Sequence, residues 1–205
     1  IRRLPVESAS IRGLYATDPL IQTKKAYEKG FAPLMALELL VKLPNMGSVL
    51  ELEGFRTICS LQRKLATVDG VHASLSAADL LLDTSSFIAK KEKNDVPTEK
   101  ELELLERFLR SEARASLLNT FLSQDGEQTR IHLTIEPEGS VAILELAQRI
   151  KKVARKSLPK GTEVTITGRN YLSAITHLNT MRNELTCFLL SVMAILLVLM
   201  VTFRS

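Results

Sequence analysis

Side chains capable of acid–base, nucleophilic or metal-binding chemistry are few in this sequence and are scattered along it. The histidines are His72, His132 and His177, which lie far apart. The first two fall in segments with strand periodicity, where a hydrogen-bonded structural histidine is more common than a metal ligand. Ser76 and Asp79 have the spacing of a nucleophile and its orienting carboxylate, but their neighbours favour a helix cap. We therefore predict no catalytic residue and no metal ligand.

Sequence motifs for cofactor binding are also absent. The chain has no phosphate-binding glycine loop, no G-x-S-x-G turn and no H-E-x-x-H helix. Cys59 falls in a helical pattern and Cys187 in a long apolar run, so no disulfide between them is expected. The sequence predicts a protein that is not an enzyme and has no cofactor.

The dominant feature of the chain is an apolar run from Leu185 to Phe203, LTCFLLSVMAILLVLMVTF. A helix over this run would be about 28 Å long, close to the hydrocarbon core of a bilayer at about 30 Å. A buried helix of a soluble domain is less favoured, because the run is apolar on every face. We predict a transmembrane helix. Its hydroxyls on Thr186, Ser191 and Thr202 should bond to their own helix, which leaves no group that could carry a proton.

The rest of the chain has the composition of a globular domain. Its net charge of +4 comes from 27 basic and 23 acidic residues that are interleaved, and there is no tryptophan. This pattern indicates a solvated surface and argues against a nucleic-acid partner. Residues 1–30 are expected to be a connector followed by a short helix, which begins after Asp18 and ends at Gly30.

Two similar strand–helix–strand units follow. The predicted ranges are 31–43, 50–68 and 71–76 for the first unit, and 130–137, 141–157 and 162–168 for the second. A helix remains the alternative for 31–43, since its residues include helix formers. Each first strand ends at a proline, Pro44 or Pro137, before a Gly-Ser-Val sequence. The repetition predicts an α+β fold, a duplicated βαβ of ferredoxin-like type. Its four-stranded sheet should be mostly antiparallel, with both helices on one face and the two first strands at the centre.

A helical insertion, residues 76–128, separates the two units. Ser76 and Asp79 should cap a short helix through Leu82, and a charged run, KKEKND, follows it. Thr98 and Glu101 repeat the capping pattern at the start of a long amphipathic segment. Its apolar stripe, expected to be core, consists of Leu102, Leu105, Phe108, Leu109, Leu117, Leu118 and Phe121.

Four stretches together resemble the RND superfamily. They are DGV…SLSAADLL at 69–81, FLSQDGEQTRIHLTI at 121–135, ITGRNYL at 166–172, and a membrane helix that ends in FRS. The most similar branch is the MMPL-like and sterol-sensing-type predicted exporters, and the resemblance runs from about Phe31 onward. In that family the similar part is the first extracytoplasmic loop with the second membrane helix.

The resemblance implies a porter-like domain over 31–171 and a lead-in with a transmembrane helix over 172–205. It implies a piece of a multi-span exporter of the inner (plasma) membrane, with the soluble domain on the extracytoplasmic side. Lipids or other hydrophobic molecules would be moved, and proton coupling would lie elsewhere in the parent protein. The expected partners are the lipid bilayer, the remaining membrane helices and the second loop.

Two other functions stay open at this stage. If the protein ended at Ser205, it would be a tail-anchored ferredoxin-like binding or scaffold module in the cytosol. Further hydrophobic spans in the parent reading frame would favour the exporter instead. A soluble enzyme with an apolar C-terminal helix comes last, because no site supports it.

A hydrophobic substrate would need an apolar passage, which we expect between the sheet-and-helix body and the insertion. The candidate lining residues are Leu105, Phe108, Leu109 and Phe121. Gly70 and Gly126 flank the insertion as candidate hinges. The alternative is that the four apolar side chains only fill the core.

Overall fold

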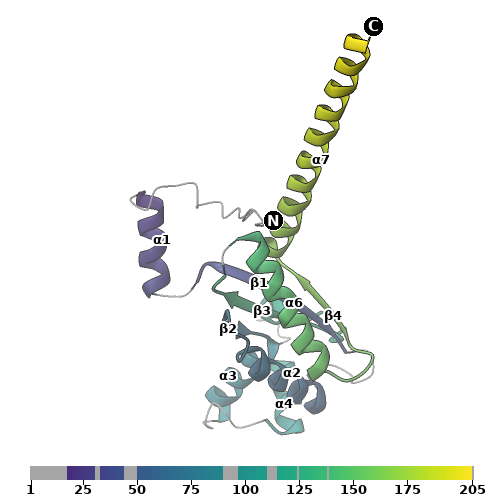
Figure 1. The fold of residues 1–205 in the computed structure, drawn as a ribbon. Helices are drawn as coiled ribbons and strands as arrows, with labels where there is room; N and C mark the ends of the chain where they lie inside the picture. Colours follow the sequence, from purple (N-terminus) through teal and green to yellow (C-terminus); the bar gives the residue numbers. More distant parts are fainter. Residues whose placement is uncertain are drawn as a thin grey trace.

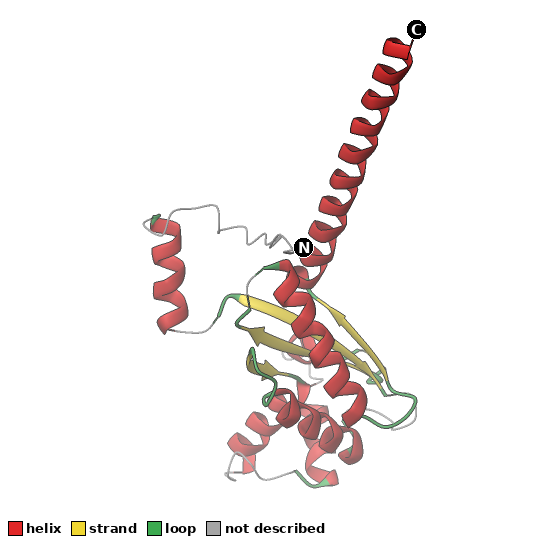
Figure 2. Cartoon of the chain, in the orientation of Figure 1, coloured by secondary structure: helices red, strands yellow, loops and turns green. Residues whose placement is uncertain are grey.

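A computed structural model describes residues 18–30, 33–43, 50–89, 97–109, 115–123, 125–137 and 139–204. Figures 1 and 2 show a sheet with helices packed on it and one long helix that projects away. The elements in chain order are α1 (Pro19–Gly30), β1 (Met35–Lys42), α2 (Leu52–Leu65), β2 (Val71–Leu75), α3 (Ala77–Ala89), α4 (Glu99–Leu109), α5 (Ala115–Phe121), β3 (Gln128–Ile135), α6 (Ser140–Ser157), β4 (Glu163–Thr167) and α7 (Arg169–Arg204).

The four strands form one sheet in the order β2-β3-β1-β4, and every neighbouring pair is antiparallel. The strands predicted to be central, β1 and β3, are central, and the helix alternative for 31–43 is wrong for the described part of that range. Alternate residues of β1 are buried, as in a strand with one face on a core. Residues 1–17, 31–32 and the NMGS turn lie outside the described residues.

The core lies on one face of this sheet. Leu37 of β1 pairs with Leu133 of β3, and Leu39 pairs with both Ile131 and Ile166, so the buried rows of three strands coincide. Helices α2 and α6 contact each other and contribute to the same core cluster. Both predicted helices therefore cover the same face of the sheet.

Three helices, α3, α4 and α5, are found in the described part of the insertion, where the sequence predicted two helical segments. α3 continues to Ala89 instead of ending near Leu82. Its hydroxyls do not break it, because Thr84 donates a hydrogen bond to the Leu80 carbonyl at 2.7 Å. α4 and α5 are the described helices of the long amphipathic segment, and residues 110–114 between them lie outside the described residues. The KKEKND run lies outside the described residues.

Both predicted helix caps are confirmed. The Asp79 carboxylate accepts a hydrogen bond from the Ser76 N–H at 2.7 Å, and the Ser76 hydroxyl accepts one from the Ala78 N–H at 3.1 Å. At the start of α4, the Glu101 carboxylate accepts from the N–H of Thr98 at 2.7 Å. These bonds satisfy N–H groups that a helix start leaves without an internal partner.

Candidate functional site

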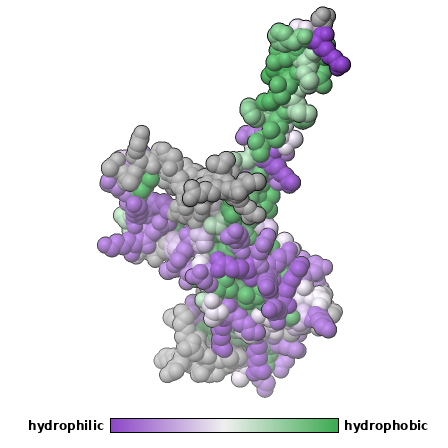
Figure 3. Space-filling model, in the orientation of Figure 1, coloured by the Kyte–Doolittle hydropathy of each residue, from purple (hydrophilic) through white to green (hydrophobic). Residues whose placement is uncertain are grey.

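The predicted membrane span lies within α7, a single helix of 36 residues. Of the helices in the described part of the chain, α7 alone is long and apolar enough to cross a membrane, and its most apolar stretch is not buried against the rest of the protein. Figure 3 shows this apolar surface projecting from a mostly hydrophilic domain. An unburied apolar surface of this size needs lipid or other helices around it.

The hydroxyls within the span bond to their own helix, as predicted. Thr186 donates to the Arg182 carbonyl at 2.8 Å, and Ser191 donates to the Cys187 carbonyl at 2.9 Å. Thr202 makes the same i−4 bond to Val198 at 2.8 Å. These bonds satisfy the hydroxyls without a partner helix, which is what hydrocarbon requires of polar groups.

The first turn of α7 is fixed to the central strand β1. The side-chain amide of Asn170 donates a hydrogen bond to the Ala36 carbonyl at 3.0 Å. Gly168, which joins β4 to α7, has a φ of +104°, and a Cβ there would lie 3.2 Å from the backbone nitrogen of Glu38. Ala174, one turn later, is buried. The membrane helix is thereby a continuous extension of the sheet domain.

Gly168→Ala is expected to lower the free energy of unfolding by about 1–3 kcal/mol, because L-residues rarely adopt this backbone conformation. The backbone of β1 cannot move away from the added methyl group without disturbing two strand ladders. Urea unfolding in detergent, followed by near-UV circular dichroism, would measure the change. Gly30→Ala is the matched control, since nothing lies within 4 Å of its Cβ position. Equal effects of the two changes would contradict the strain argument.

The candidate passage residues occupy different environments. Leu105 is 4% exposed and belongs to the core, whereas Phe108 on the same helix is 38% exposed. Phe121 on α5 is half-buried and packs against the core. The side chain of Leu109 lies outside the described residues. The passage between insertion and body stays a prediction.

Phe121 also lines a pocket of about 230 Å³. Its lining includes Leu40 of β1 and Arg130 of β3, together with residues of α5. Leu40 and Arg130 are directly opposite in the β1–β3 ladder, and the guanidinium of Arg130 lies 3.6 Å from the Glu38 carboxylate. The sequence did not identify this pocket, because α5 and β1 are far apart in the chain.

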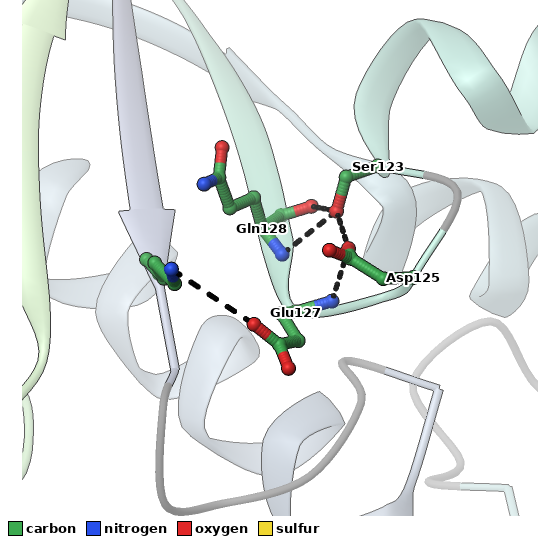
Figure 4. Close-up of polar contacts among 5 residues, drawn as sticks. Ser123, Asp125, Glu127 and Gln128 are labelled. Atoms are coloured by element: carbon green, nitrogen blue, oxygen red, sulfur yellow. Dashed lines mark hydrogen bonds and ion pairs between the residues drawn. The ribbon is translucent and has the colours of Figure 1, made fainter.

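A hydrogen-bonded turn joins α5 to β3 beside this pocket (Figure 4). The Ser123 hydroxyl donates to the Asp125 carboxylate and accepts from the Gln128 N–H at 2.9 Å. The Asp125 carboxylate also accepts from the Glu127 N–H at 3.0 Å. The hydrogen bond from Ser123 is the main reason that the pKa of the Asp125 carboxyl is lowered. The ionised carboxylate therefore stabilises the turn at neutral pH, and this stabilisation is lost as the pH falls through the lowered pKa. Lys42 and Glu127 form an ion pair at 4.0 Å across the turn.

A buried polar network fixes the start of the insertion to α2. The Ser76 hydroxyl donates to the side-chain carbonyl of Gln62 at 2.9 Å, and the Gln62 amide donates to Asp79 at 2.6 Å. Ser76 therefore takes part both in the cap of α3 and in a contact between α3 and α2. Burial raises the pKa of the neighbouring Cys59 thiol to about 11, and the Asp79 charge adds to this. The thiol is protonated at neutral pH and is a poor nucleophile.

The histidines lie on three different elements, β2, β3 and α7. His72 is 3.9 Å from the Glu136 carboxylate, and His132 is opposite Glu38 in the β1–β3 ladder. Nε2 of His177 is buried and has no hydrogen-bond partner among the described residues. No group of three metal-binding side chains is found in the part of the chain that the structure describes.

Comparison with known families decides the classification. A model of the MMPL family matches residues 48–205. The chain belongs to the MMPL family. This membership confirms the resemblance to RND-type exporters, and the MMPL match extends from before α2 through the whole of α7. The matched range does not include residues 31–47, although the sequence resemblance to the RND superfamily begins at about Phe31. No curated protein matches this MMPL chain.

Membership of the MMPL family agrees with the geometry of α7. MMPL proteins are membrane-associated transport proteins of the RND type, and the matched range ends with the apolar helix. The family match and the apolar helix together support a membrane-associated transport protein.

Proposed function

We propose that this chain is the substrate-handling part of a larger MMPL exporter for lipids or other hydrophobic molecules. The observation that carries the proposal is the unbroken α7, which joins an apolar span to the central strand of the sheet domain. A rigid helix of this kind transmits movement between the membrane and the domain. The remaining membrane helices and the second loop of the parent protein are the proposed partners of the span and the domain.

The strand order supports a more specific fold. The order β2-β3-β1-β4, with α2 between β1 and β2 and α6 between β3 and β4, is that of a split βαβ of ferredoxin-like type. We propose that the domain is a duplicated βαβ of the porter type, with α3, α4 and α5 as an insertion between the halves. The sheet domain would lie on the extracytoplasmic side of the inner membrane.

Energy conversion belongs elsewhere in this proposal. The span from Leu185 to Phe203 has no ionisable group that could relay a proton at neutral pH, and intramembrane acids and bases are the usual proton carriers of pumps. The chain is proposed to have no enzymatic activity of its own. Its contribution would be to admit, hold or release the substrate.

The test uses the full-length parent exporter with a change of charge on α4. Phe108→Glu is expected to abolish transport of a fluorescent lipid into inverted membrane vesicles, whose lumen is the extracytoplasmic side, because a carboxylate in an apolar passage is costly to desolvate. The domain should stay folded, since Phe108 is partly exposed. Leu104→Glu, on the same helix at 65% exposure, is the matched control and should export normally.

Normal export by the Phe108→Glu protein would remove the support for a passage along α4. Equal loss of export in both variants would indicate a general defect of α4 and would also contradict the passage. Thermal unfolding of both proteins in detergent separates loss of folding from loss of transport.

A further inference from the structure

The excess positive charge of this chain is concentrated on helix α6. The whole sequence has 27 basic and 23 acidic residues, which gives a net charge of +4. The basic residues of α6 are Arg149, Lys151, Lys152, Arg155 and Lys156, and its one acidic residue is Glu145. The net charge of this single helix is therefore also +4. Outside α6, the basic and acidic residues of the sequence balance each other.

Four of these side chains form one exposed row, which we call the basic stripe. A period of 3.6 residues places them within about 120° on the side of α6 opposite the buried Leu146 and Ile150. They are Arg149, Lys152, Arg155 and Lys156, and all four are exposed. Arg149 forms an ion pair with the fully exposed Asp69 at 3.8 Å. No ion pair joins the other three to any residue in the described part of the chain.

The stability of α6 does not account for the whole stripe. Positive side chains in the last turn of a helix interact favourably with its dipole, which explains Arg155 and Lys156. Arg149 and Lys152 lie before the last turn. Lys152 has a like charge three residues before it and others three and four residues after it, a spacing that destabilises a helix. An anionic partner along the stripe would remove this repulsion.

A hollow of about 450 Å³ lies at the C-terminal end of α6, between this helix and α2. Arg56, Thr57 and Ser60 of α2 line it together with Ser157, the last residue of α6. The guanidinium of Arg56 is of the kind that binds a carboxylate through two hydrogen bonds, and the hydroxyls can donate further ones. Glu53 is the one acidic side chain in the lining. The hollow extends the positive surface of the stripe with hydrogen-bond donors.

The stripe lies toward the end of the domain that is farthest from the membrane helix. α6 begins shortly after β3 ends, at the end of the sheet from which α7 departs, and it finishes before β4 begins at the opposite end. Figure 1 shows α6 running away from the base of α7. Residues 169–184 of α7 add about 24 Å between the sheet and the span. This length exceeds the Debye length of about 8 Å, so the headgroups of the membrane that α7 enters are not the partner of the stripe.

The exposed groups of α2 and α6 fit an acidic protein segment. Single-stranded nucleic acids need aromatic side chains for base stacking, and these two helices expose none. We propose that the basic stripe and the adjoining hollow bind a carboxylate-rich segment of a partner protein. Its carboxylates would lie along Lys152 and Lys156 and would reach Arg56 in the hollow. This contact involves neither a lipid substrate nor α4, so a failed export test leaves it unaffected.

The experiment uses the full chain in nanodiscs of phosphatidylcholine at physiological salt, with a fluorescent oligoglutamate peptide as the probe. Fluorescence anisotropy measures its binding. Lys152→Glu combined with Lys156→Glu is expected to weaken binding about tenfold, because two attractive contacts become repulsive. The matched control is Lys25→Glu combined with Lys29→Glu, which makes the same change of charge at exposed sites of α1. It should change binding by less than about twofold, because salt screens distant charges.

Three results would overturn the proposal. One is the absence of peptide binding to the original protein, or binding that the change at Lys152 and Lys156 leaves intact. Another is equal weakening by the control pair, which would indicate attraction to net charge alone. The third is tighter binding of a polyphosphate with the same number of charges, which would indicate a phosphate polymer as the partner. Thermal unfolding of each variant in nanodiscs separates loss of binding from loss of folding.

Discussion

Leu105→Ala is expected to lower the free energy of unfolding by about 2–5 kcal/mol, because it leaves a cavity in a close-packed core. Leu105 is among the buried residues of the core cluster that joins the insertion to the sheet domain. Leu104→Ala, one position earlier on the same helix, removes the same atoms from an exposed site. Leu104→Ala should change the free energy of unfolding by no more than about 0.5 kcal/mol. Urea unfolding of both proteins in detergent measures the difference.

This comparison also decides the role of Leu105, which the sequence placed among the candidate passage residues. If Leu105→Ala loses stability and export in proportion, the side chain is a core residue. If stability is kept and export is lost, Leu105 lines the passage. Similar stabilities for Leu104→Ala and Leu105→Ala would contradict the packing of α4 against the core.

Ala194→Arg is expected to weaken membrane insertion of the chain by about 2.5–3.5 kcal/mol, the cost of an arginine at the centre of a span on an insertion scale. Ala194 lies mid-way along the apolar part of α7 and is exposed in the described structure. The fraction of protein that resists extraction from membranes at alkaline pH measures the effect.

Ala194→Leu is the control for this change and should leave insertion unaffected or improve it, because leucine is favourable at the same depth. If the Ala194→Arg protein resists extraction from membranes as well as the original protein does, the prediction of a membrane span is contradicted. Recovery of the original chain as a dispersed monomer without detergent would contradict it as well.

Local features of this protein were predictable from its sequence because their causes lie within a few residues. The caps at Ser76 and Thr98 depend on side chains three residues apart. The membrane span depends on an uninterrupted apolar run, and β1 on a short apolar run that ends at Pro44. The bounds of α6 and β4 followed from periodicity and from turns in the same way.

Contacts between distant segments were decided only by the tertiary structure. The sequence could not indicate that Gly168 would pack on the backbone of Glu38, or that Gln62 would bind Ser76 and Asp79. An apolar stripe predicts that leucines face a core, but it does not determine which ones are covered. Leu105 and Phe108 share one pattern and differ in burial because their neighbours come from other helices. Periodicity reports one element at a time, whereas burial depends on how several elements pack together.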